Sequence, residues 1–219
     1  MTSSEEALNH LCLKKNKVSA HFLISKQGKI YNLVDLRKRA WHAGKAFWKN
    51  ELDINSQSIG IEIDNSGELL KNEKYTSLQI SALKKLLDFL IKSYKINKEN
   101  ILGHSDVSPY RKIDPGRKFP WSILDKLFSN NSLIKSKKKK FLKKDILIKK
   151  NLLKKTKKNA LLILSIIGYD VTPAKKSKIQ YSKLIRVYQL HYRNDEVTGK
   201  LDQNTYELLL NQYKEILTI

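Results

Sequence analysis

The sequence predicts an α/β fold followed by a small C-terminal domain of three helices. Three observations predict it. Short runs rich in β-branched and aromatic residues recur in the first hundred positions, a long amphipathic pattern of helical spacing lies among them, and only helical patterns follow residue 158. With 219 residues, of which 41% are hydrophobic, the chain can bury one sizeable core and a smaller second one.

The first predicted elements are a helix and a hairpin. Residues 3–13 are predicted to be helical, because a Ser-x-x-Glu capping box opens the stretch and apolar residues follow at helical intervals. Residues 20–25 and 28–34 are two β-rich runs around a Lys-Gln-Gly turn, which is typical of a β-hairpin. His21 lies in the first run, where a histidine is more often packed and hydrogen-bonded than a ligand.

A third strand is predicted at residues 58–64, where alternating isoleucines share one face and Glu62 falls on the other. A carboxylate in an apolar strand is costly unless it is solvated, paired or functional. Glu62 is therefore either a solvent-facing edge residue or a functional group. Residues 76–95 are predicted to form an amphipathic helix, because leucines recur at helical spacing with lysines opposite.

After Asn97 the chain is predicted to form a short strand that delivers His104 to the stretch 103–121. This stretch contains three prolines and two glycines, which indicates a loop presented by a rigid sheet edge. His104 and Asp114 are residue types that suit zinc, and the turns between and after them could bring them together. On those two residues alone, an ordinary surface loop is the commoner explanation.

The formal net charge is +22, and more than half of this excess lies between residues 135 and 158, where thirteen lysines stand against Asp145. The tract predicts a linker or a basic helix over residues 129–158. Its charge either favours weak association with an anionic surface or is simply a solvated face. No apolar run is long enough for a transmembrane segment, and the single cysteine, Cys12, excludes an internal disulfide.

Residues 159–219 are predicted to be the second domain. Helices are expected at residues 159–167, 181–192 and 204–216, the first of which ends at Gly168 and Tyr169. Taken alone, this pattern fits any small helical bundle, and His191 within it is more plausibly a packed or surface residue than a metal ligand.

Five ordered motifs resemble those of the zinc-dependent N-acetylmuramoyl-L-alanine amidases of the AmpD/AmiD type, relatives of the peptidoglycan-recognition fold. The motifs are Val18–Ile24, Gly28–Tyr31, Ala40–Gly44, Ser58–Ile63 and the final H-x7-K-x-D-P-G pattern that begins at His104. The resemblance implies a mixed central β-sheet flanked by helices over residues 1–128. The helical motifs of residues 159–219 resemble, in turn, the three-helix peptidoglycan-binding domain that accompanies many such amidases.

The resemblance implies hydrolysis of the amide between the lactyl group of N-acetylmuramic acid and L-alanine, in peptidoglycan or muropeptides, during cell-wall turnover. One zinc ion, Zn2+, is the implied cofactor, with His104 and Asp114 matching two of its ligands. Glu62 matches the catalytic carboxylate that activates the attacking water, and Lys112 would stabilise the oxyanion of the tetrahedral intermediate.

The substrate cleft is expected to involve Trp41, His42 and His21. Trp41 and His42 precede the small residues Ala43 and Gly44, which suits a groove wall that contacts a sugar or a peptide. A loop pinned by a buried Trp41 explains the same residues nearly as well. In the family, the histidine that corresponds to His21 is structural or lies near the substrate.

One departure from the family pattern concerns the start of the chain. In the family a buried strand precedes the first helix and ends in a histidine, the first of three zinc ligands, and nothing here matches it. The third protein ligand is therefore expected upstream of Met1, through a start assigned too late. The alternative is a genuine loss, which would leave a non-catalytic peptidoglycan-binding protein.

The sequence also bears on a second alternative function, nucleic-acid binding, and on the cellular compartment. Nucleic-acid binding is suggested by the charge but disfavoured, because the lysines lack interleaved aromatics and a reading module, so no specific nucleic-acid partner is expected. The polar, acidic start is unlike a secretory signal and favours the cytoplasm. A wall-binding domain favours the periplasm or the cell wall, with an export signal then encoded upstream.

Overall fold

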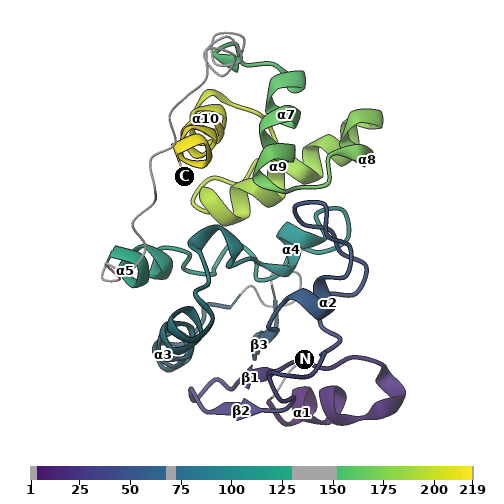
Figure 1. The fold of residues 1–219 in the computed structure, drawn as a ribbon, viewed down its shortest axis with the longest axis vertical. Coiled ribbons are helices and arrows are strands. Elements are labelled where there is room, and N and C mark those ends of the chain that lie inside the picture. Colours follow the sequence, from purple (N-terminus) through teal and green to yellow (C-terminus); the bar gives the residue numbers. More distant parts are fainter. Residues whose placement is uncertain (1–3, 68–72, 130–151, 219) are drawn as a thin grey trace.

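A computed structural model describes residues 4–67, 73–129 and 152–218 (Figure 1). The described residues from 4 to 129 form an α/β unit around a small sheet, and residues 152–218 form a helical unit that packs against it. Most of the Lys-rich tract lies outside the described residues, as does the first residue of the expected capping box. The boundaries predicted at residues 128 and 159 stay a prediction.

The sheet has three strands, β1 (Phe22–Ile24), β2 (Ile30–Asn32) and β3 (Ile61–Ile63), in the order β2-β1-β3. Strands β1 and β2 are antiparallel, with Leu23 opposite Tyr31, as the predicted hairpin requires. Strands β1 and β3 are parallel. The sheet is therefore mixed, as expected, and β3 is an edge strand of the sheet that the described residues form.

A helix covers each face of the sheet. Because successive side chains of a strand point to opposite faces, Phe22 and Ile24 pack against leucines of α3 (Ser77–Tyr94), whereas Leu23 packs against buried residues of α1 (Ser4–Cys12). Glu62 is in register with Leu23, so it shares the face of α1. The prediction of a sheet flanked by helices is confirmed.

Helix α3 begins and ends at signals of its own sequence. Thr76 accepts a hydrogen bond from the N–H of Gln79, whose side chain in turn accepts from the N–H of Thr76, which completes a capping box. At the other end Lys95 adopts a left-handed conformation and donates its N–H to the carbonyl of Ile91. These caps fix the helix that supports the isoleucine face of the sheet.

The strand expected before His104 is not present. Lys98–Asn100 form a short 3-10 helix, η2, and residues 101–103 are extended but belong to no strand of the three-stranded sheet. His104–Val107 form the single-turn helix α4, where a loop was predicted. An extended segment becomes a strand only when a neighbouring strand pairs with it. A cavity is lined by both β3 and residues 101–103, so these residues have no strand beside them to pair with among the described residues.

The helical unit contains the three expected helices and one more. They are α7 (Lys157–Ile167), α8 (Thr172–Lys176), α9 (Lys178–Tyr192) and α10 (Gln203–Thr218). The remaining short helices of the α/β unit are η1 (Lys14–Asn16), α2 (Ile54–Gln57) and α5 (Ile123–Ser129). Among the described helices, none combines the length and apolar character that a bilayer span needs.

The two units share one hydrophobic core. Trp48 and Val107 of the α/β unit belong to the same buried cluster as Leu164 and Tyr169 of the helical unit. The rings of Trp48 and Tyr169 meet edge to face at 4.9 Å between centroids, and the N–H of Lys49 donates to the carbonyl of Gly168 at 2.9 Å. We therefore expect the units to unfold together.

Replacing the fully buried Leu164 by alanine should lower the free energy of unfolding by about 2–5 kcal/mol, because it leaves a cavity in the shared core. Denaturant unfolding followed by tryptophan fluorescence checks this, since all three tryptophans (Trp41, Trp48 and Trp121) lie in the α/β unit. Leu162→Ala on the same helix, at a position 45% exposed, should change the value by less than about 0.5 kcal/mol. A fluorescence transition unmoved by Leu164→Ala would contradict the shared core.

Candidate functional site

The structure brings together the two residues that the sequence proposes as metal ligands. His104 begins α4, and its Nδ1 lies 3.0 Å from Oδ2 of Asp114. The backbone also joins them, because the N–H of Ser105 donates to the carbonyl of Asp114 at 2.9 Å. The nine residues between them thus form a loop that closes on itself and presents both side chains at one place.

The hydrogen bonds around His104 determine what its ring offers. Nε2 lies 3.0 Å from the carbonyl oxygen of Ala43, which can only accept, so the network assigns the ring hydrogen to Nε2. In the neutral ring, Nδ1 then directs a lone pair at the Asp114 carboxylate. Two acceptors 3.0 Å apart need a cation between them, either a proton or a metal ion. The pair therefore fits two ligands of a zinc ion.

Two further charged groups act on this pair. Burial raises the pKa of Glu62, and the charge of Asp114 raises it further, against smaller opposing effects of His104 and Lys112. Burial also acts to raise the pKa of Asp114, but the hydrogen bond and charge of His104, with help from Lys112, lower it overall. The four groups thus lie close enough to influence one another, with Glu62 the carboxylate held most readily in its protonated form.

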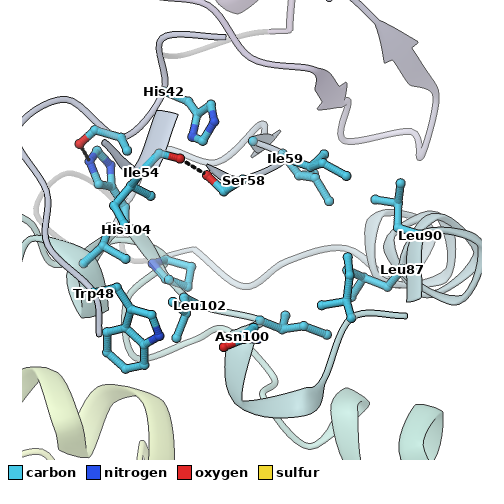
Figure 2. A pocket seen from close by; sticks show the side chains of 18 of the residues that line it. His42, Trp48, Ile54, Ser58, Ile59, Leu87, Leu90, Asn100, Leu102 and His104 are labelled. Carbon is cyan, nitrogen blue, oxygen red and sulfur yellow. Dashed lines mark hydrogen bonds between the residues drawn. The ribbon is translucent and has the colours of Figure 1, made fainter. Parts of the chain in front are cut away.

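A cavity of about 870 Å³ adjoins these groups. Figure 2 shows His42 and His104 on one side of it and Leu87 and Leu90 of α3 on the other. Glu62 and Asp114 also line it, together with the isoleucines of β3 and residues 101–103. The cavity therefore combines apolar walls with a polar end at the candidate site, and it runs along the edge of the sheet.

The rings of His42 and His21 meet edge to face, with centroids 5.7 Å apart. Both ring nitrogens of His21 are engaged by the backbone, Nε2 with the carbonyl of Lys38 and Nδ1 with the N–H of Gly60, each at 3.0 Å. His42 lines the cavity and lies directly over Gly60, where a Cβ would come within 2.3 Å of its ring. Only glycine can occupy that position without displacing His42.

Trp41 is 54% exposed, so the alternative of a loop pinned by a buried Trp41 is wrong. The guanidinium of Arg39 lies 4.3 Å from the centre of its ring. The loop is held instead by the buried Asn55, whose Oδ1 accepts from the N–H groups of His42 and Ala43. An exposed indole next to the cavity-lining His42 is available for contact with a ligand.

The described part of the chain contains no group of three histidine, cysteine or acidic side chains placed to hold a metal ion. A catalytic zinc site normally has three protein ligands and one open position. His104 and Asp114 thus fit part of such a site.

Comparison with known proteins identifies the family. The family model of the N-acetylmuramoyl-L-alanine amidases (Amidase_2) matches residues 1–117, more than half of the chain. The chain belongs to this family. Amidases of this family are in general zinc-dependent hydrolases.

The alignments with individual relatives cover different shares of the chain. AmiD of Escherichia coli, an N-acetylmuramoyl-L-alanine amidase, is 31% identical over 216 residues, which cover 92% of the chain and 76% of AmiD. AmpD of Haemophilus influenzae, a 1,6-anhydro-N-acetylmuramyl-L-alanine amidase, is 43% identical over 106 residues, or 48% of the chain. That match spans only about half of AmpD, 55% of its length.

Two solved structures resemble the whole fold. E. coli AmiD, in complex with anhydro-N-acetylmuramic acid-L-Ala-D-γ-Glu-L-Lys, matches 99% of the chain and 86% of its own with a TM-score of 0.80 and 26% identity. AmpDh3 of Pseudomonas aeruginosa, in complex with anhydromuramic pentapeptide, covers 99% and 89% with a TM-score of 0.79 and 26% identity. Both similarities extend over the α/β unit and the helical unit.

Sequence reasoning missed three residues that support the site. Nη2 of Arg111 donates to the carbonyl of Ala43 at 3.0 Å and lies 3.4 Å from Nε2 of His104. The hydroxyl of Tyr75 donates to the carbonyl of Pro115 at 2.9 Å. Asp106, within α4, has a completely buried carboxylate. Arg111 and Asp106 lie within the motif, but their partners are backbone atoms and residues far along the chain, which no local pattern signals.

His42 should remain neutral well below the pH at which an ordinary histidine takes up a proton. Burial, and then the neighbouring His21, lower its pKa to about 4, against about 6.5 in an unfolded chain. The unfolded chain therefore binds the extra proton between these values, so His42 makes stability fall as the pH falls from 6.5 towards 4. NMR titration of the imidazole C–H signals checks this. His42→Gln should remove that part of the pH dependence, and a His42 signal that titrates near 6.5 would contradict it.

Proposed function

We propose that this chain is a zinc-dependent amidase that hydrolyses the bond between the lactyl group of N-acetylmuramic acid and L-alanine in peptidoglycan or its fragments. The observation that carries the proposal is the His104–Asp114 pair, which lines the polar end of a cavity together with Glu62 and lies within reach of the charge of Lys112. The relatives support it, since AmiD and AmpDh3 were solved with anhydromuramyl peptides. Fragments of this kind, released during cell-wall turnover, are the proposed substrates.

His104 and Asp114 would hold the zinc ion, with the Nε2–H bond to Ala43 orienting the ring. When bound, zinc would supply an activated water and polarise the scissile carbonyl. Glu62 would accept a proton from the attacking water and pass it to the leaving amine of L-alanine. Its partly apolar surroundings suit this role, because a raised pKa makes the carboxylate a better proton acceptor. Lys112 would stabilise the oxyanion of the tetrahedral intermediate.

The third protein ligand would come from an extended segment upstream of Met1. The cavity supports this part of the proposal, because it runs between the edge strand β3 and the extended residues 101–103. An added strand there would cover the apolar walls and pair with backbone groups on both sides. Its end would lie at His104 and Asp114, where the described residues lack a third donor.

Substrate contacts are proposed for Trp41 and His42, the exposed indole and the cavity-lining imidazole of one loop. His21, with both nitrogens bonded to the backbone, would contribute by supporting His42. The helical unit and the Lys-rich tract would add affinity for the wall, the tract through weak, salt-sensitive attraction to anionic polymer.

A second candidate function is a non-catalytic peptidoglycan-binding protein. It is favoured by one observation, that the described residues supply two metal-binding side chains rather than three. Two ligands bind zinc much more weakly than three, so the zinc content of the purified protein separates the two functions.

Zinc stoichiometry should be measured together with muropeptide hydrolysis, on the 219-residue chain and on a chain extended upstream in the same reading frame. We expect one zinc ion and release of L-alanyl peptide from the extended chain only. A His104→Ala variant of the extended chain should lose both. If no upstream histidine is encoded and neither chain cleaves, the binding-protein function holds and the amidase function is wrong.

Glu62→Gln in the active form of the protein should lower the rate of hydrolysis by about 10²–10⁴-fold, the usual contribution of general acid–base catalysis. Zinc binding should be retained, because the amide has nearly the same shape and Glu62 is not a proposed ligand. Rates on a muropeptide, with zinc content measured in parallel, check this. Loss of zinc in the variant, or an unchanged rate, would contradict the role of Glu62.

A further inference from the structure

The loop of residues 103–121 carries the metal-binding pair on one side and lies against the helical unit on the other. Helix α4, the first turn of this loop, lies next to α9 in Figure 1, and the two helices are in contact. We call residues 103–121 the ligand loop. Whatever holds the ligand loop in place also sets the positions of His104, Lys112 and Asp114.

Asp106 is the centre of this contact. Its carboxylate is completely buried and has three partners. The N–H of Gly103 donates to Oδ2 at 2.7 Å, the hydroxyl of Tyr169 donates to Oδ1 at 2.6 Å, and Nδ1 of His191 lies 2.8 Å from Oδ2. The first bond closes the turn from Gly103 to Asp106, which contains His104. The other two come from the helical unit, and hydrogen bonds to a buried carboxylate are among the stronger ones in proteins.

His191 is held rigidly in its place. Its ring stacks on Trp121 at 3.6 Å and on Tyr192 at 4.0 Å between centroids, with interplanar angles of 14° and 3°. Trp121 ends the ligand loop and Tyr192 belongs to α9, so the imidazole is clamped between the two units. It cannot turn away from Asp106 without breaking both stacks, which fixes the direction of its hydrogen bond.

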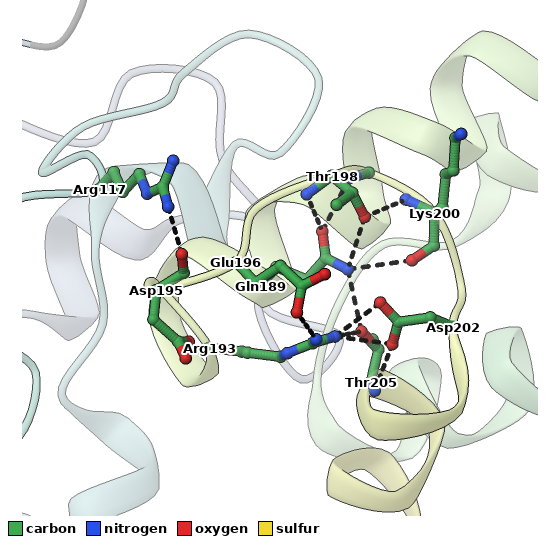
Figure 3. Close-up of polar contacts among 10 residues, drawn as sticks. Arg117, Gln189, Arg193, Asp195, Glu196, Thr198, Lys200, Asp202 and Thr205 are labelled. Carbon is green, nitrogen blue, oxygen red and sulfur yellow. Dashed lines mark hydrogen bonds and ion pairs between the residues drawn. The ribbon is translucent and has the colours of Figure 1, made fainter.

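A second contact holds the distal part of the ligand loop. Arg117 donates to the backbone carbonyls of Asn194 and Asp195, the former at 2.9 Å, and the side chain of Asn194 donates back to the carbonyl of Phe119 at 2.8 Å. Figure 3 shows the bond between Arg117 and Asp195 reaching across to the helical unit. The ligand loop is thus attached near both of its ends.

The segment that receives Arg117 is braced from within (Figure 3). The buried side chain of Gln189 accepts from the N–H groups of Thr198 and Gly199, and Arg193 forms an ion pair with Asp202. The connection between α9 and α10 is therefore fixed to its own helices. A rigid support of this kind transmits the position of the helical unit to the ligand loop.

We propose that the helical unit is a positioning element of the amidase site: Tyr169 and His191 hold Asp106, which in turn holds His104 in register with Asp114. The role of the ligand loop rests on the proposed function, whereas the mechanical coupling does not. Because Ser105 donates to the carbonyl of Asp114, a shift of α4 changes both metal-binding residues together.

Hydrogen–deuterium exchange of the metal-free full chain tests the coupling. In Tyr169→Phe, and more strongly in His191→Leu, we expect amides of residues 101–117 to exchange about tenfold faster or more, since each change removes one donor from the buried carboxylate. His191→Asn should restore slow exchange, because its side-chain amide can donate from nearly the position of Nδ1. In the chain extended upstream, zinc affinity measured by chelator competition should fall and recover in the same variants.

Tyr206→Phe is the matched control. Tyr206 is also fully buried in the helical unit, and its hydroxyl donates to the carbonyls of Leu152 and Lys154, remote from the ligand loop. It should lower the melting temperature without selective exchange in residues 101–117. Equal exchange of these residues in Tyr169→Phe and Tyr206→Phe would overturn the proposal. Because exchange needs neither zinc nor turnover, this result is independent of whether the chain proves to be an amidase.

Discussion

The buried carboxylate of Asp106 is the interaction on which the arrangement of this protein depends. A carboxylate removed from water must be met by donors, and here they come from the backbone at Gly103, from Tyr169 and from His191. The two carboxylate oxygens of Asp106 therefore connect the ligand loop, through its first turn, to the helical unit. The shared apolar core around Trp48 adds buried apolar surface to the contact between the two units. The hydrogen bonds of Asp106 define the geometry of that contact.

On the opposite side of the ligand loop, the interactions are electrostatic effects among neighbouring ionisable groups. His104, Asp114, Glu62 and Lys112 lie close together. The hydrogen bond and charge of His104 lower the pKa of Asp114, whereas burial and the charge of Asp114 raise that of Glu62. One carboxylate is thereby kept ready to bind a cation and the other to accept a proton. The ligand loop is thus supported by the helical unit on one side and carries a group of ionisable side chains on the other. This arrangement suits hydrolysis at a metal centre.

Much of the fold was predictable from local patterns. The hairpin around β1 and β2, the isoleucine strand β3 and the amphipathic α3 follow from periodicity and caps that need no distant partner. The strand expected before His104 was wrong for the opposite reason, because strand formation depends on a neighbour that the described residues do not supply. Trp41 was equally undecided in the sequence, since the same aromatic residue can pin a loop or stand exposed.

The sequence by itself determined which residue types stand at the site and in what order, because the spacing of His104, Lys112 and Asp114 is a property of the chain. Only the tertiary structure decided what surrounds them. The carbonyl of Ala43 that orients His104, the guanidinium of Arg111 beside it, and the Tyr169 and His191 side chains behind Asp106 come from positions 60 or more residues away or have backbone partners. Such contacts are set by packing between units, and packing leaves no local periodicity in a single sequence.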